Sequence, residues 1–284
     1  MFIIRKLGAL FLWVNKFLWL LFPNSFHQSR PGLAWGRFIF FLVNLKNDHI
    51  QLTTTYFLRN RAELAQFGQI ISEMPGPLNI AVIGCSEGAE VYSIIMTANK
   101  AMPELKINIE AFDINESALN IAKRSRYPSD SRLFKYVHHD EISESFISDN
   151  DWLIVKPEFR EKVNWNLGDP TQEPLLSSIP KHDILFINRL LFHMSPEEAE
   201  RCLSAAANLV RPGGYLFVSG VDLDLRTRLA RAGKWRPITD HIEEIHAGDE
   251  TMTLDWPFER WGLEPIDKNH RDWPLRYCSI FQIP

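Results

Sequence analysis

The chain has 284 residues, of which 45% are hydrophobic and 23% charged, a composition that excludes a disordered tail and suits one large globular domain or two small ones. Lysine and arginine total 31 against 35 aspartate and glutamate residues, so the net charge of -4 gives no reason to expect nucleic acid as a partner. Three cysteines, Cys85, Cys202 and Cys278, lack paired spacing. This argues against a disulfide framework or a cysteine-rich zinc site, and favours a reducing, cytoplasmic compartment.

The first segment, from Met1 to Phe22, is far more apolar than the rest of the chain. A helix of this length could cross a bilayer, but it carries Arg5, Lys6, Asn15 and Lys16, and two cations held near the middle of the bilayer would each cost roughly 3 kcal/mol. On a helical wheel these cations leave about half of the helix surface purely apolar. The pattern favours a helix that lies on a membrane surface. Two alternatives stay open, namely packing on the main domain or across a homodimer, and a transmembrane span.

A second apolar block, residues 38–43, follows Pro23 and Pro31, where we expect the helical path to break. No short apolar core with a small-residue cleavage site precedes it, so the sequence does not predict a removable signal peptide.

After residue 46 the composition becomes ordinary, and short runs rich in Ile, Val and Phe alternate with helical patterns. The predicted strands are 79–84, 107–113, 163–166, 183–188, 215–219 and 276–282, and the predicted helices are 90–101, 116–126 and 195–210. The last helix has a clear start, with Ser195 as N-cap and Pro196 in the first turn. This alternation predicts a doubly wound α/β fold with a mostly parallel sheet.

The loop after the first strand, residues 84–90, reads GCSEGAE and therefore has neither the GxGxxG nor the GK[ST] pattern of common nucleotide-binding loops. The second strand ends at Asp113, followed by Ile114. A carboxylate at this strand tip can accept both hydroxyls of a ribose, so the loop and the acid together favour a nucleoside-type ligand. An alternative is that Asp113 caps the following helix.

Four segments taken in order resemble the CheR-type methyltransferases, the protein-glutamate O-methyltransferases of bacterial chemotaxis. The segments are TTTYFLR at 53–59, SEGAEVYS at 86–93, FDIN at 112–115 and VKPEFR at 155–160, with RPGGYLF at 211–217 beyond them. The resemblance covers roughly residues 52–219. It implies a Rossmann-like class I methyltransferase with a seven-stranded sheet, S-adenosyl-L-methionine as cofactor and S-adenosyl-L-homocysteine as product. The implied organisation is an apolar helical N-terminal segment, 1–46, followed by a CheR-like methyltransferase domain, 47–284.

The resemblance also implies roles for individual residues. Thr53, Thr55 and Arg59 would face the cofactor, while Glu90 and Asp113 fall on the family's loop glutamate and ribose-binding aspartate. The full implied cofactor-binding set is Thr53, Thr55, Arg59, Gly84, Ser86, Gly88, Glu90, Asp113, Ile114, Asp169, Pro170, Asn188 and Arg189.

The sequence departs from the family pattern mainly on the acceptor side. Ala89 and Val91 replace a glutamate and a proline of the family loop, and Asn188-Arg189 reverses the family's Arg-Asn pair. His193 stands where the family has a tyrosine next to the methyl acceptor. The family's small helical N-terminal domain is replaced by the apolar segment. These differences suggest an enzyme that has kept its methyl donor and changed its acceptor.

We therefore expect an S-adenosylmethionine-dependent O-methyltransferase that acts on a small-molecule, glycan or lipid-linked acceptor near the membrane. In this hypothesis His193 is the general base for a hydroxyl, because imidazole titrates near neutral pH, and Arg59 places the methionine carboxylate or the acceptor. Two alternatives are a chemoreceptor-type protein-glutamate O-methyltransferase and a non-catalytic cofactor-binding scaffold. No metal is expected, since the histidine pairs at 138–139 and 241–246 lack a fixed set of ligands. The expected place is the cytoplasm, peripheral on the inner face of the membrane.

Overall fold

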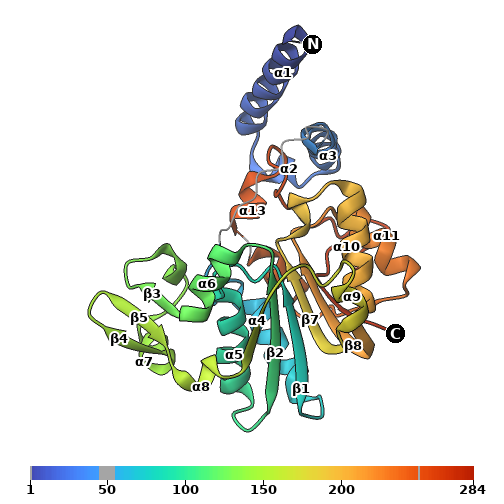
Figure 1. Ribbon diagram of the computed structural model, residues 1–284. Helices are drawn as coiled ribbons and strands as arrows, with labels where there is room; N and C mark the ends of the chain where they lie inside the picture. Colours follow the sequence, from blue (N-terminus) through green and yellow to red (C-terminus); the bar gives the residue numbers. More distant parts are fainter. Residues whose placement is uncertain (1, 45–54, 249) are drawn as a thin grey trace. The chain divides into compact units, whose positions relative to one another are not determined.

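The computed structural model describes residues 2–44, 55–248 and 250–284, with side chains described from residue 10 onward except at 250–252 (Figure 1). The described residues form two compact units, one made of 2–44 with 250–273 and the other of 55–248 with 274–284. The division at residues 46 and 47 stays a prediction. The structure adds that a segment more than 200 residues further along the chain groups with the N-terminal helices.

The first unit contains α1 (Phe2–Leu21), α2 (Asn24–His27), α3 (Arg30–Asn44) and α13 (Glu250–Asp255). Trp19 of α1 is buried, stacks on His27 at 4.1 Å, and makes an edge contact with Trp256 at 5.5 Å between ring centroids. Arg37 holds Glu264 with two hydrogen bonds of 3.0 and 3.1 Å. These contacts explain why residues 250–273 belong to this unit.

The helical path breaks just before Pro31, because α2 ends at His27 and α3 begins at Arg30. Pro31 lies in the first turn of α3, which begins at Arg30 and runs through the apolar block at 38–43. Proline is tolerated there because the first-turn N–H groups have no partner within the helix in any case. Among the described residues, the helices lack the combination of length and apolarity that crossing a bilayer requires.

The second unit is built on a seven-stranded sheet in the order β6-β2-β1-β7-β8-β10-β9. The strands are β1 (Leu78–Ile83), β2 (Ile107–Asp113), β6 (Val163–Leu167), β7 (His182–Asn188), β8 (Val210–Ser219), β9 (Arg236–Pro237) and β10 (Ile280–Gln282). The neighbours from β6 to β8 pair in parallel, whereas β10 is antiparallel to both β8 and β9. This confirms the predicted doubly wound α/β class with a mostly parallel seven-stranded sheet.

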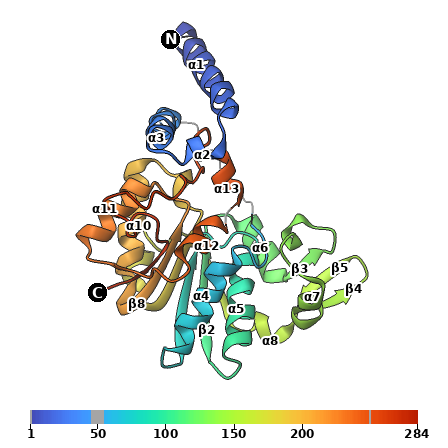
Figure 2. The ribbon, with the colours of Figure 1, turned by 180° about the vertical axis from the view of Figure 1, so that it is seen from behind.

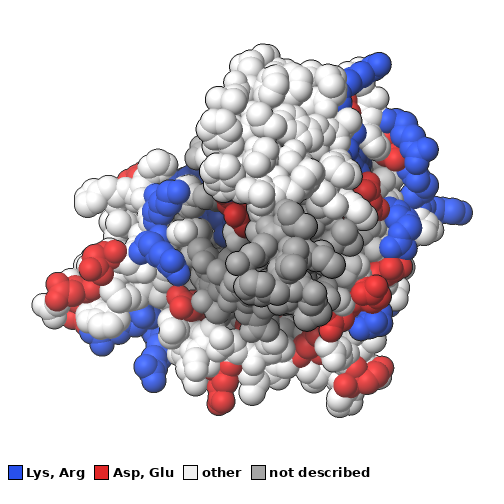
Figure 3. Space-filling view, turned by 90° about the horizontal axis from the view of Figure 1, so that it is seen from above, with Lys and Arg blue, Asp and Glu red and all other residues white. Residues whose placement is uncertain are grey.

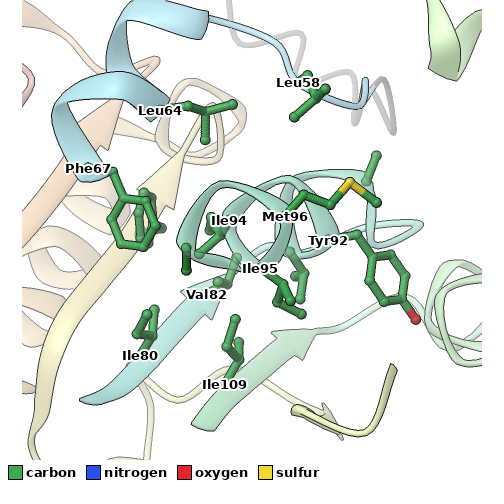
Figure 4. Close-up of a cluster of buried hydrophobic side chains, with 14 of the residues drawn as sticks. Leu58, Leu64, Phe67, Ile80, Val82, Tyr92, Ile94, Ile95, Met96 and Ile109 are labelled. Atoms are coloured by element: carbon green, nitrogen blue, oxygen red, sulfur yellow. The ribbon is translucent and has the colours of Figure 1, made fainter. Parts of the chain in front are cut away.

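Helices α4 (Arg61–Ser72) and α5 (Ala89–Ala101) cover one face of this sheet, as Figure 2 shows. Their apolar side chains point at β1 and β2, where Ile80, Val82 and Ile109 are completely buried (Figure 4). Phe67 of α4 also contacts the rings of Phe186 and Phe217 on β7 and β8. Alternate residues of these strands point to the opposite face, which α10 (Pro196–Asn208) contacts.

The remaining elements lie around this core. They are α6 (Glu116–Arg124), α7 (His139–Ser145), α8 (Pro157–Arg160), α9 (Leu175–Ser178), α11 (Leu223–Ala232), α12 (Ile242–Ala247), and the short 3-10 helices η1 (Arg132–Phe134) and η2 (Leu191–His193). A separate antiparallel sheet in the order β3-β5-β4 is formed by β3 (Arg126–Pro128), β4 (Phe146–Asp149) and β5 (Trp152–Val155). The sequence did not predict this second sheet.

The strand order reverses between β1 and β7. From β1 the chain builds outward through β2 and β6, and then returns to form β7 on the other side of β1. Loops that leave such a switch point diverge to opposite faces of the sheet and open a crevice at the carboxyl ends of the strands. The fold therefore directs the search for a site to residues that follow β1, β2 and β7.

Candidate active site

A cavity of about 150 Å³ lies at the carboxyl ends of β1, β2 and β7. Its walls come from the segment before α4 and from the three turns that follow these strands. The lining residues are Thr55, Arg59, Gly84, Ser86, Glu90, Asp113, Ile114, Asn115, Ala118, Asn188, Arg189, Leu190, His193 and Met194. The fold thus gathers in one place most of the site residues that the sequence proposed.

The loop after β1 turns sharply through three left-handed residues, Gly84, Ser86 and Gly88, with φ values of 76°, 49° and 87°. At Gly88 a side chain would also collide with its surroundings, because an added Cβ would lie 2.9 Å from both Ala122 and Trp165. Gly88 itself does not line the cavity. It acts by letting α5 begin close to the sheet, which brings Glu90 in its first turn into the cavity wall.

Asp113 connects the tips of the first two strands. One carboxylate oxygen accepts a 2.7 Å hydrogen bond from the backbone N–H of Ser86, and the other accepts a 2.8 Å bond from that of Asn115. The alternative role of Asp113 as a helix cap is wrong, since Asn115 caps α6 by accepting from the N–H of Ala118. The carboxylate is therefore held in the cavity wall with lone pairs left for further donors.

Two carboxyl groups, Glu90 in the cavity wall and the buried Glu63, share one amide. The side-chain nitrogen of Asn188 donates to Glu90 at 2.9 Å and to Glu63 at 3.3 Å, and its oxygen accepts from Ser219 at 2.9 Å. Burial raises the pKa of Glu63 to about 7, with the negative charge of Glu90 adding to the rise. Burial also raises the pKa of Glu90. Because all its polar atoms are engaged, Asn188 orients Glu90 rather than offering free donors to a ligand.

Two arginines face these acids. Burial lowers the pKa of Arg59, while Glu90 and Glu63 act in the opposite direction. Burial, with Arg59 nearby, lowers the pKa of Arg189 to about 9. Among the described residues, the buried Nη1 of Arg59 has no hydrogen-bond partner. A buried guanidinium nitrogen without a partner suits an anionic group of a ligand.

His193 is half-buried in η2 and lines the cavity from the turn after β7. The chain leaves β7 through Arg189, whose φ of 55° turns it out of the sheet, and the ring of His193 lies 4.3 Å from that of Phe192. The turn places a titratable side chain in the wall that also holds Arg59.

Three other proposed residues lie elsewhere or outside the description. Asp169 and Pro170 do not line this cavity, and Asp169 accepts hydrogen bonds from Thr171 and Gln172. Thr53 lies outside the described residues. The cofactor-binding roles of these residues stay predictions.

The sequence reasoning missed Glu63. Glu63 is three residues after the N-cap Asn60, a spacing that normally indicates an exposed helix start. Its backbone N–H does donate to Asn60, but its side chain is buried against Asn188. The sequence feature that could have pointed to Glu63 is its closeness to Arg59, which belongs to the segment at 53–59 that was assigned to the cofactor.

The strand order, the glycine loop after β1 and the carboxylate at the tip of β2 define a class I S-adenosylmethionine-dependent methyltransferase. The model of the CheR methyltransferase SAM-binding domain matches residues 53–224, which is more than half of the chain. The chain therefore belongs to the CheR methyltransferase family, and S-adenosyl-L-methionine is its cofactor.

Proteins that are similar in sequence include chemotaxis protein methyltransferases. A chemotaxis protein methyltransferase of Campylobacter jejuni strain 81-176 is 26% identical over 223 residues, covering 77% of this chain and 81% of that one. One from Listeria innocua is 23% identical over 207 residues, covering 69% and 77%. Among solved structures, the magnesium protoporphyrin IX methyltransferase of Synechocystis PCC 6803 with bound SAM matches with 16% identity, a TM-score of 0.39, and coverage of 63% and 68%.

The cavity residues fit this cofactor chemically. The two ribose hydroxyls of the cofactor need hydrogen-bond acceptors. Its ammonium group needs an anion, and its carboxylate needs a cation. Asp113, Glu90 and the buried Nη1 of Arg59 offer these three in one cavity. When bound, the cofactor supplies a methyl group on a positively charged sulfur.

Proposed function

We propose that this methyltransferase O-methylates a hydroxyl group on a small-molecule, glycan or lipid-linked acceptor, and that it meets this acceptor in the cytoplasm, peripheral on the inner face of the membrane. The observation that supports the proposal is His193 in the wall of the cavity that also contains Asp113, Glu90 and Arg59. A carboxylate acceptor needs no base, whereas a hydroxyl gains from one.

In this proposal each side chain has a separate task. Asp113 accepts from the ribose hydroxyls, Glu90 faces the ammonium group, and Arg59 holds the carboxylate. A ring nitrogen of His193 takes the proton of the acceptor hydroxyl while the side chains around it exclude water. Arg59 also contributes to placing the acceptor.

The test of the base is the pH profile of His193→Ala and His193→Gln between about pH 5.5 and pH 8.5. Glutamine keeps a hydrogen-bonding group but cannot titrate, so both variants are expected to lose about 10²- to 10⁴-fold in turnover and the rise in rate near neutral pH. His139→Gln, on the exposed surface of α7, is the matched control and should behave like the natural protein. An unchanged rate and profile in the His193 variants would remove the assignment.

The class of acceptor is tested with radiolabelled cofactor added to membrane and soluble cell fractions. Label in a lipid, glycan or small-molecule fraction supports the proposal. Cofactor binding without any transfer would instead favour a scaffold.

Protein-glutamate methylation is the second candidate. It is favoured by the names of the relatives, which are chemotaxis protein methyltransferases at 23% and 26% identity. Label that enters a protein band and is released by mild base, as a glutamyl methyl ester is, would establish this candidate and overturn the first.

A further inference from the structure

Helix α1 presents a continuous apolar face to solvent. Leu10, Trp13, Phe17, Leu20 and Leu21 are between 55% and 73% exposed. At 100° per residue these five side chains span about 100° of the helix, over an axial length of about 16 Å. An isolated exposed leucine needs no explanation, but a strip of large side chains in register marks an interaction surface.

The opposite side of the same helix packs against other residues of the N-terminal unit. Trp19 is only 6% exposed and packs against Trp35 and Trp256. Asn15 accepts a 3.0 Å hydrogen bond from the indole N–H of Trp35. Because Trp19 and Asn15 fix one side of α1 to the N-terminal unit, the exposed strip on the other side of the helix always faces away from that unit.

The charged residues of α1 are all positive. Helix α1 holds three lysines and arginines and no aspartate or glutamate, whereas the rest of the chain holds 28 basic and 35 acidic residues. Lys16 is exposed, with its ammonium group 5.9 Å from the ring of Phe258. Figure 3 shows a broad area, on the side that faces upward in Figure 1, without basic or acidic residues.

We propose that α1 docks on the surface of an anionic lipid bilayer, with its exposed strip inserted at the level of the headgroups and the ammonium group of Lys16 against the anionic lipids. Lysine and arginine combined with Trp, Phe and Leu on a helix of this kind are typical of interfacial anchors. The inference rests on the membrane location within the proposed function and names the lipid chemistry that would be recognised.

The same charges argue against a second copy of this chain as the occupant. Two copies that met through α1 would bring together two helices that each carry three cations and no acid. An anionic bilayer instead attracts each lysine or arginine near its surface by about 1 kcal/mol, which is about fivefold in binding.

The test is flotation of the full-length protein with vesicles of phosphatidylcholine containing about 30 mol% phosphatidylglycerol, and with vesicles of phosphatidylcholine alone. We expect binding to the anionic vesicles that falls as salt rises from about 0.1 to about 0.5 M, and much less binding to the neutral ones. The double variant Trp13→Glu/Phe17→Glu should bind at least about tenfold more weakly, and Lys16→Gln about fivefold more weakly.

The matched control is Ile147→Glu/Trp152→Glu, which places two acids at exposed apolar positions of the small sheet and should bind vesicles normally. Equal flotation of the α1 double variant, or no flotation of the natural protein, overturns the docking. A dimer that the α1 variant dissociates, without vesicle binding, assigns the strip to a second copy. Calorimetric cofactor titration and methyl transfer are measured on the same samples, so that loss of docking and loss of the proposed function are told apart.

Discussion

Replacing Glu63 by glutamine is expected to stabilise the protein above pH 7. Burial raises the pKa of this carboxyl from 4.5 to about 7 on folding. Its ionisation therefore costs the folded state up to about 3 kcal/mol relative to the unfolded chain. The glutamine oxygen can still accept the hydrogen bond from Asn188, which lies 3.3 Å from Glu63, while the buried charge is removed.

The sign follows from the two pKa values. Below pH 4.5 the carboxyl is protonated in both states, so Glu63 and glutamine should differ little. As the pH rises from 4.5 to 7 the unfolded chain loses its proton first, and the stability of the natural protein falls relative to Glu63→Gln. Above pH 7 the difference is complete, which corresponds to an increase in melting temperature of up to about 10 °C for a unit of this size.

Urea unfolding of both full-length proteins at about pH 5, 6, 7 and 8 measures this difference, and titration of the groups that do not interact with Glu63 cancels. Glu141→Gln is the opposite control, since the Arg61 guanidinium lowers the pKa of Glu141 to about 2. Because the ion pair lies at the surface, this control should lose only about 0.5 to 1 kcal/mol at pH 7, and the loss should disappear on strong acidification. If Glu63→Gln is less stable than the natural protein at pH 8, Glu63 is a charged partner of the arginines and the reasoning is refuted.

Three further outcomes are expected. Asp113→Asn should weaken cofactor binding by about 10- to 100-fold in calorimetry, because a charged acceptor is lost, and unchanged affinity would remove Asp113 from the site. Gly88→Ala should cost about 1 to 3 kcal/mol more than Gly213→Ala in thermal unfolding, since both have positive φ but only Gly88 lacks room for a Cβ. Arg37→Leu should lower the free energy of unfolding of the N-terminal unit by about 1 to 3 kcal/mol, because it removes the two hydrogen bonds that hold the buried Glu264. Tryptophan fluorescence in urea measures this loss, and an unchanged free energy of unfolding would disprove the anchoring role of Arg37.

The main sheet could be predicted because each strand carries its own signal. The runs that form β1 and β7 are short and bounded by turns, and they are buried at almost every position, which suits a mostly hydrophobic sequence. The run that forms β2 instead alternates buried Ile107, Ile109 and Ala111 with the polar Asn108 and Glu110. The strands of the small sheet are only three or four residues long, so their pattern is too short to separate from a loop.

The sequence by itself determined the order of six strands of the main sheet and of α5, α6 and α10, the loop after β1, the carboxylate at the tip of β2, and the apolar and basic character of the N-terminal segment. These features are local, since each depends on residues close together in the chain. Only the tertiary structure decided that Asn188 holds Glu63 and Glu90 together, that Asp169 lies outside the cavity wall, and that Trp256 packs on Trp19. Such contacts join residues up to 237 positions apart, and which side chains meet over that distance is fixed by packing and by the desolvation of buried charges, which no local pattern records.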